Sequence, residues 1–296
     1  MPGTGSPAGG VLDRLALRVT ESVQEPFRVG RVIGRSFSIW RRNLVLLFVL
    51  ALVVSSPRIL YAVYLTLWPP PPPVLPPPSA FDEGFLAWSA PYLLEPTVIR
   101  LMRSLFIHLS EAVVIFAVYQ RLRGEAATFG ESFRGGLRRI WPVVRVATTL
   151  FVLEFLIWLA VFYIVFDGLH SLVLALYFSY IAPLLSLLLL SPFWVAVPAA
   201  VVERSKSFLR RSWILTRGHR LRVYLILVIV HAIDWGVGRL YIVVDPDLPM
   251  PLSMAVWWTQ DLLLVALAAV IAVVGYHALR LEKDGVDASD LAEVFA

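Results

Sequence analysis

The stretch LVLLFVLALVVSSPRILYAVYLTLW, residues 44–68, decides the fold, because it is almost wholly apolar and carries a single charge, Arg58. A hydrocarbon core about 30 Å thick requires about 20 helical residues at a rise of about 1.5 Å each. Five further stretches meet this requirement: Val98–Tyr119, Val143–Phe166, Leu172–Val202, Val223–Val244 and Met254–Leu279. The sequence therefore predicts an all-α, polytopic membrane bundle of six transmembrane helices.

The composition agrees with a membrane protein. Of 296 residues, 58% are hydrophobic and 16% are charged, and the mean hydropathy is +0.76. There is no cysteine, which excludes disulfides and thiolate metal sites. We expect a flexible cytoplasmic segment over 1–25, a six-span membrane domain over 26–282 and a cytoplasmic tail over 283–296.

The distribution of charge predicts the topology. Most of the 26 Lys and Arg residues lie before the first span, after the second and after the fourth, whereas the opposite loops carry mainly acids such as Asp82, Glu83, Asp245 and Asp247. Cytoplasmic loops retain Lys and Arg. We therefore predict a multi-pass protein of the cytoplasmic (inner) membrane with both termini cytoplasmic. Because the basic residues border membrane spans, anionic phospholipid is the expected partner, and not nucleic acid.

A basic and aromatic pattern recurs ahead of each odd-numbered span. Its three copies are Ser36–Arg42, Ser132–Trp141 and Ser207–Trp213. Such segments are typical of amphipathic helices that lie in the membrane interface with guanidinium groups among phosphates. The expected headgroup-binding residues are Arg41, Arg42, Arg138, Arg139, Arg210 and Arg211. The alternative to a true repeat is that the positive-inside bias and aromatic belts produce the pattern on their own.

Two local features predict helix boundaries. Thr128 and Glu131 have the spacing of a capping box, which would start the second interfacial helix. The fourth apolar stretch contains Pro183, Pro192 and Pro198, so we expect it to be kinked or divided into two pieces.

Several segments resemble a known family. They are Pro26–Gly30, Ser36–Asn43, Phe129–Phe133, Val197–Ala199 with Glu203, Arg211–Gly218, and a tail with Leu279–Arg280, Lys283–Gly285, Asp287, Leu291 and Val294–Phe295. This pattern is similar to the bacterial membrane-domain family found ahead of some glycerophosphoryl diester phosphodiesterases, which also has stand-alone members. The tail reads Asp284-Gly285 where the family favours Glu-Gly. The resemblance implies a six-span bundle of mostly unassigned biochemistry. No segment corresponds to the phosphodiesterase domain, so diester hydrolysis does not carry over.

Ionisable residues inside the predicted spans form a candidate buried polar network. Each costs about 2.5–3.5 kcal/mol at the centre of a membrane helix on insertion scales, so each requires a partner or a function. The set is Arg58, Arg103, His108, Glu111, Glu154, His231, Asp234, Arg239 and Asp261. Acids and arginines fall at adjacent depths, which favours ion pairs between helices.

Two His-x-x-acid pairs stand out in this set. His108 and Glu111 share one face of the second span, and His231 and Asp234 share one face of the fifth. If these antiparallel spans are neighbours, His108 would meet Asp234 and Glu111 would meet His231. The four groups could lock the bundle by hydrogen bonds, relay protons or bind a divalent metal.

The sequence supports three hypotheses of function. The first is a non-enzymatic membrane module, without a cofactor, that organises anionic phospholipid or a partner protein, with homo-oligomers also possible. The second is a small transporter or lipid translocator that uses the buried charges. The third is an intramembrane metal-dependent hydrolase built on the two His-x-x-acid pairs.

Overall fold

The computed structural model describes residues 27–69, 85–169, 182–203, 207–244 and 249–285. Its regular elements are α2 (Val29–Arg42), α3 (Leu44–Leu67), α4 (Phe85–Leu122), α5 (Phe129–Leu137), α6 (Ile140–Leu169), the 3₁₀ turn η2 (Ser191–Phe193), α8 (Ala196–Val202), α9 (Phe208–Thr216), α10 (Arg220–Val244) and α11 (Met250–Asp284). These ranges contain no strand, and the all-α prediction is confirmed. The predicted N-terminal segment and the tail beyond Gly285 lie outside the described residues.

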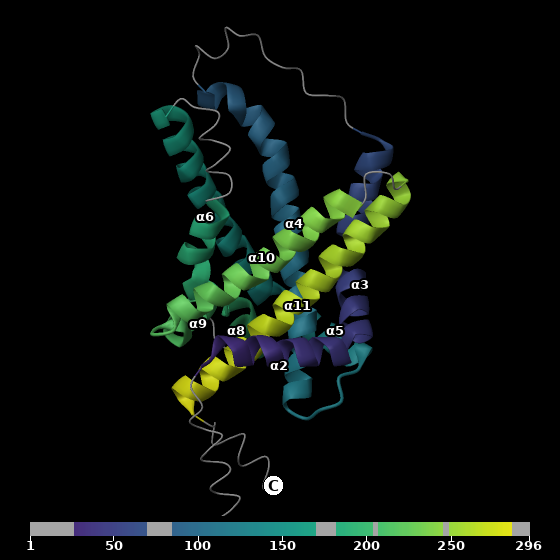
Figure 1. The fold of residues 1–296 in the computed structure, drawn as a ribbon, viewed down its shortest axis with the longest axis vertical. Coiled ribbons are helices and arrows are strands. Elements are labelled where there is room, and N and C mark those ends of the chain that lie inside the picture. The colour runs from purple at the N-terminus through teal and green to yellow at the C-terminus, as the bar shows by residue number, and fades with distance from the viewer. Residues whose placement is uncertain (1–26, 70–84, 170–181, 204–206, 245–248, 286–296) are drawn as a thin grey trace, which may run out of the picture.

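Six helices in the described ranges are long and apolar enough to cross a membrane. They are Leu44–Leu67, Thr97–Leu122, Ile140–Val161, Ala182–Val202, Arg220–Arg239 and Met250–Asp284. The chain is therefore a multi-pass membrane protein, as the apolar stretches predicted. In Figure 1, α3, α4 and α6 stand along the long axis, α10 and α11 cross the bundle obliquely, and α2 lies across its lower end.

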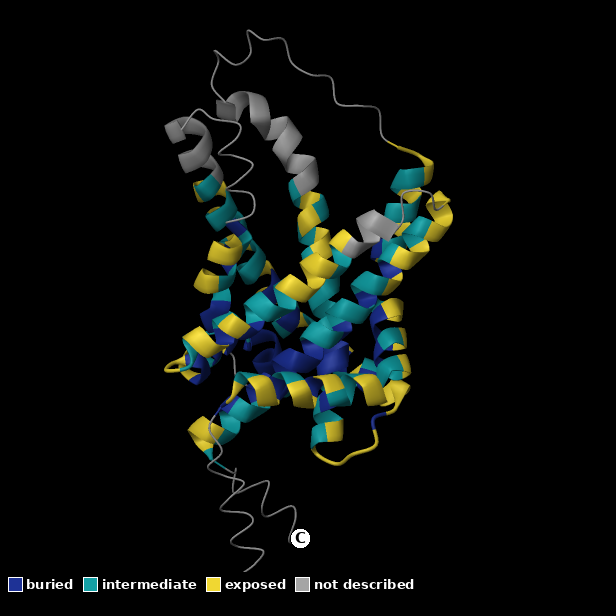
Figure 2. Cartoon of the chain, viewed as in Figure 1, coloured by how far each residue is buried: buried dark blue, intermediate teal, exposed yellow. Residues whose placement is uncertain are grey.

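The core forms where α4, α8 and α11 meet, near the end of the bundle that α2 covers. α4 packs against α3, α5, α6, α8 and α11. α11 contributes a buried run of small and branched side chains from Ala269 to Val274, and every residue from Ala196 to Val201 in α8 is buried. Figure 2 shows this buried centre, whereas the outer faces of the described helices carry exposed residues.

The three predicted interfacial helices are present: α2 precedes α3, α5 precedes α6, and α9 precedes α10. α2 packs against α10 and α11 through a face that includes Val32 and Ser36. Thr128 caps α5 as expected, since its hydroxyl accepts a hydrogen bond from the Glu131 amide at 3.4 Å. We call the end of the bundle that carries α2, α5 and α9 the basic end.

The fourth span is broken, as its prolines predicted. A helix over 182–190 ends at η2, which contains Pro192, and α8 completes the span. The Pro192 carbonyl accepts hydrogen bonds from the Ser212 hydroxyl at 2.8 Å and the Thr216 hydroxyl at 3.1 Å, both buried on α9. The interfacial helix α9 thus satisfies a polar group that the break exposes.

Candidate functional site

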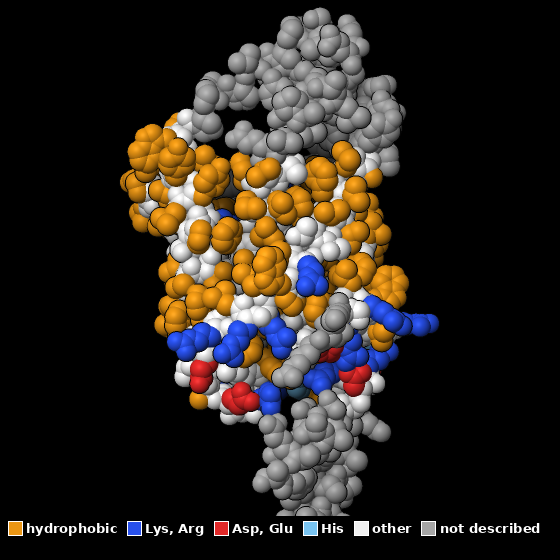
Figure 3. Space-filling view, turned by 180° about the vertical axis from the view of Figure 1, so that it is seen from behind, with side chains coloured by type: hydrophobic (Ala, Val, Ile, Leu, Met, Phe, Trp, Pro, Cys, Tyr) orange, Lys and Arg blue, Asp and Glu red, His pale blue; other side chains and the backbone are white. Residues whose placement is uncertain are grey.

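A band of exposed arginines surrounds the basic end. Arg41 and Arg42 on α2, Arg138 after α5 and Arg210 on α9 are exposed, and Arg139 is half-buried. Apolar residues of the same segments are exposed as well: Phe37, Trp141 and Trp213. Figure 3 shows blue arginine and lysine side chains gathered below a broad orange apolar belt. This arrangement of cations beside an apolar belt matches the border between headgroups and acyl chains.

Arg211 departs from the predicted headgroup set. Its Nε donates to the Glu203 carboxylate at 2.8 Å, and its terminal nitrogens donate to Asp284, while the Tyr276 hydroxyl donates to Glu203 at 2.7 Å. The hydrogen bonds to Asp284 and then to Glu203 raise the pKa of Arg211. The packed face of α9, with Ser212 and Leu215, carries this guanidinium inward, so Arg211 is half-buried and bonded to carboxylates, unlike the exposed Arg210.

A second cluster joins distant segments at the same end. The Phe27 amide donates to Glu282 at 2.8 Å, His219 lies 3.1 Å from the same carboxylate, and Arg222 donates to the Phe27 carbonyl at 2.9 Å. Sequence reasoning did not place Glu203, Tyr276 or Glu282 in a site. Their position at the ends of apolar spans indicated a polar environment, but it did not indicate with which residues they form hydrogen bonds or ion pairs.

Within the spans, the main ion pair joins α3 to α11. A terminal nitrogen of Arg58 donates to the Asp261 carboxylate, whose other oxygen lies 3.8 Å from Arg103 on α4. The Arg58 guanidinium also lies over the Trp258 ring at 4.8 Å. Arg58 is 8% exposed, and its Nε and second terminal nitrogen have no hydrogen-bond partner among the described residues.

The four candidate metal ligands do not come together. His108 Nδ1 lies 2.7 Å from the carboxylate of Glu111, on its own helix. The main contacts of α10, which carries His231 and Asp234, are with α2, η2 and α11. In the parts of the chain that the structure describes, no group of three or more His, Asp or Glu residues could hold a metal. The metal site fails because α10 crosses the bundle without packing along α4.

The remaining members of the network lie on α6 and α10. Asp234 is exposed and interacts electrostatically with His231, Asp261 and Arg103. Arg239 is placed over the Trp235 ring at 5.2 Å. Glu154 on α6 is exposed and acts electrostatically on His108.

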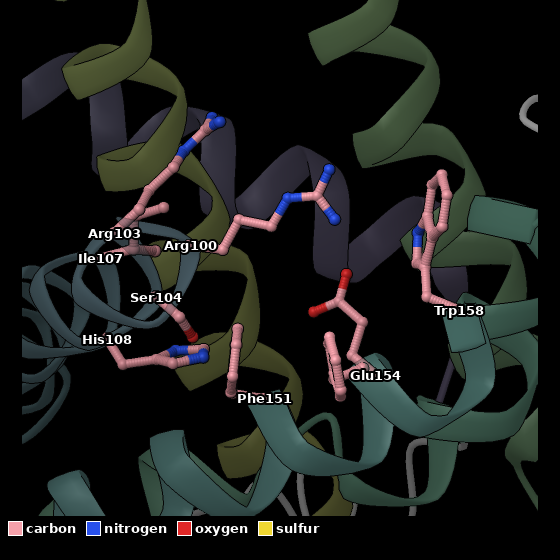
Figure 4. A pocket seen from close by; sticks show the side chains of 9 residues that line it. Arg100, Arg103, Ser104, Ile107, His108, Phe151, Glu154 and Trp158 are labelled. Carbon is pink, nitrogen blue, oxygen red and sulfur yellow. The ribbon is translucent and has the colours of Figure 1, made fainter. Parts of the chain in front are cut away.

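A crevice between α4 and α6 brings Arg103, His108 and Glu154 of this set together with residues that were not predicted. It has a volume of about 480 Å³ and is lined by Arg100, Arg103, Ser104, Ile107, His108, Phe151, Glu154, Phe155 and Trp158. In Figure 4 the Arg100 side chain extends from α4 toward Glu154 on α6. Arg100 and Trp158 were missed because an arginine near the start of a predicted span gives no indication of a cavity.

A second cavity of about 230 Å³ lies deeper in the bundle and reaches Trp194, Val197 and Pro198. His108 and Glu154 line both cavities. The two hollows therefore meet at an ionisable pair, one side chain from α4 and one from α6.

Comparisons with protein-family models, curated proteins and solved structures found no match.

Proposed function

We propose that the protein is a non-enzymatic membrane module that binds anionic phospholipid at its basic end. The observation that carries the proposal is the placement of exposed arginines on or next to α2, α5 and α9, beside exposed aromatic residues and a broad apolar surface. Each basic residue near an anionic leaflet contributes about 1 kcal/mol of attraction at low ionic strength.

Lipid retention measured by native mass spectrometry tests this proposal. The protein is reconstituted in nanodiscs that contain equal parts phosphatidylglycerol and phosphatidylcholine and is then released gently. In the variant with Arg41, Arg42, Arg138 and Arg210 changed to Gln, retained phosphatidylglycerol should fall, by up to about fivefold for each arginine.

The matched control replaces the same four arginines by Lys. Lysine keeps the positive charge, so phosphatidylglycerol retention should stay near the parent value. Unchanged retention in the Gln variant, with the same melting temperature as the parent, would refute the lipid-binding proposal.

We also propose that the basic end faces the cytoplasm of a bacterial inner membrane and that the chain is a relative of the phosphodiesterase-associated membrane family. The positive-inside rule supports the orientation. The family proposal is supported by contacts between segments that carry the resemblance. The hydrogen-bonded clusters at the basic end include four residues of these segments: Phe27, Glu203, Arg211 and Asp284. Labelling of single cysteines introduced at residues 138 and 285 in intact cells would test the orientation.

A second candidate function, lipid translocation, is favoured by one observation: the two cavities meet at His108 and Glu154. A pathway for a polar headgroup requires polar groups that continue into the bilayer. Glu154→Gln should then abolish the flip of a fluorescent phospholipid in vesicles while leaving the melting temperature unchanged. Equal flip rates for parent, variant and empty vesicles would exclude translocation.

A further inference from the structure

The crevice between α4 and α6 follows from helical periodicity. Arg100, Ser104 and His108 recur every four residues and so share one face of α4, while Phe151, Glu154 and Trp158 share one face of α6. In the described part of the chain, the residues that line the crevice come from these two helices. α6 makes its main contacts with α4 and α8. The described lining of the crevice therefore comes from two of the membrane-spanning helices.

The crevice carries charges of both signs on opposite walls. Arg100 and Arg103 on α4 are exposed, and Glu154 is exposed on α6. Arg100 lies over the Trp158 ring at 5.5 Å. In the described part of the chain, no ion pair within 4.0 Å engages Arg100 or Glu154, and Arg103 has only a 3.8 Å approach to an Asp261 already bonded to Arg58.

Unpaired charges at membrane depth call for a complementary ligand. Two guanidinium groups suit a phosphate, which Arg binds with paired N–H donors. A carboxylate on the facing wall suits an ammonium group. We propose that this crevice binds the headgroup of a zwitterionic aminophospholipid, with its phosphate at Arg100 and Arg103 and its ammonium at Glu154.

The apolar lining of the crevice favours a lipid over a soluble zwitterion. Its volume of about 480 Å³ lies in the range of small-ligand pockets. Ile107, Phe151 and Phe155 supply apolar walls, and exposed Met102 and Leu156 lie on the same two helices. A headgroup can therefore enter from the side while its acyl chains remain in the bilayer.

This site is distinct from the basic end. The arginine band offers cations and favours lipids with net negative charge, whereas the crevice pairs cations with a carboxylate and favours a lipid with no net charge. The two proposals can fail independently, because the variants that test them share no residue.

Native mass spectrometry from nanodiscs of equal parts phosphatidylethanolamine and phosphatidylglycerol tests the crevice. The parent should retain phosphatidylethanolamine at the crevice in addition to the phosphatidylglycerol held at the basic end. Arg100→Gln combined with Arg103→Gln should reduce retained phosphatidylethanolamine at least tenfold. Glu154→Gln should reduce retained phosphatidylethanolamine and leave the phosphatidylglycerol held at the basic end unchanged. Arg100→Lys keeps the positive charge and should therefore retain more phosphatidylethanolamine than Arg100→Gln. This difference would show that the loss in the Gln variant comes from the charge and not from a folding defect.

Arg145→Gln is the matched control, since Arg145 is an exposed arginine of α6 that does not line the crevice. It should leave the retained lipids unchanged. Equal retention in parent, Glu154→Gln and the double arginine variant would overturn the proposal. Detergent-solubilised parent should bind lysophosphatidylethanolamine at least tenfold more tightly than soluble glycerophosphoethanolamine. Equal affinities would also overturn it, because they would assign the crevice to a soluble zwitterion.

Discussion

Arg58 of α3 and Asp261 of α11 form an ion pair across the bundle, although 203 positions separate them in the sequence. Pro57 precedes Arg58 inside α3 and lacks the N–H that would bond to the Val53 carbonyl. The Ser56 hydroxyl donates to that carbonyl instead, at 2.8 Å. The continuous helix α3 thus lacks one backbone hydrogen bond next to a buried charge. The ion pair links three spans, since Arg103 of α4 approaches the same carboxylate.

Asp261→Asn should destabilise the protein by about 3–5 kcal/mol, because it leaves the Arg58 guanidinium buried without a counter-charge. The double variant Arg58→Met and Asp261→Leu should recover most of this loss, since both charges are then removed. Unfolding by SDS titration from mild detergent measures both free energies. A single variant as stable as the parent would show that the pair contributes nothing.

Arg211→Gln should destabilise the basic end by about 1.5–3 kcal/mol, because it removes charge-assisted hydrogen bonds to Glu203 and Asp284. The neighbouring Arg210→Gln is the matched control and should stay within about 0.5 kcal/mol of the parent, since Arg210 is exposed. Melting temperatures in detergent distinguish them. Equal shifts in the two variants would contradict the inward assignment of Arg211.

Gly136→Ala should cost about 1–3 kcal/mol through overpacking. A Cβ at this position would lie 2.7 Å from the backbone Cα of Val113, so α5 could not remain as close to α4. Gly130→Ala on the same helix meets nothing within 4 Å and should be neutral or slightly stabilising. Thermal unfolding of the two variants provides the comparison. The prediction fails if Gly136→Ala and Gly130→Ala have the same melting temperature.

The double variant Ser212→Ala and Thr216→Val should cost about 1–3 kcal/mol, because it leaves the buried Pro192 carbonyl without its two hydroxyl donors. Either single change should cost less, since one donor remains. Limited proteolysis next to η2, together with the melting temperature, measures the loosening. If the double variant resists protease like the parent, α9 does not support the break in the fourth span.

The local features of the fold could be predicted from the sequence. Residues 44–68 and the other apolar stretches specified the spans, and basic aromatic segments such as Ser36–Arg42 specified the interfacial helices. Thr128 with Glu131 and the prolines of the fourth stretch specified a cap and a break. Hydropathy, charge and turn chemistry depend on a few consecutive residues. The structures that they specify can therefore be predicted without knowing which helices pack together.

The candidate site depended on tertiary structure. Sequence patterns treated Arg210 and Arg211 alike, yet α9 turns one outward and the other into an ion-pair cluster. They also left open whether the second and fifth spans are neighbours, whereas in the structure His108 bonds to Glu111 and Arg58 reaches Asp261. Apolar helices fit a bilayer in any rotation and order, so hydropathy alone does not select their neighbours. Side-chain packing makes that choice, and it therefore decides which charges become paired and which remain facing the crevice between α4 and α6.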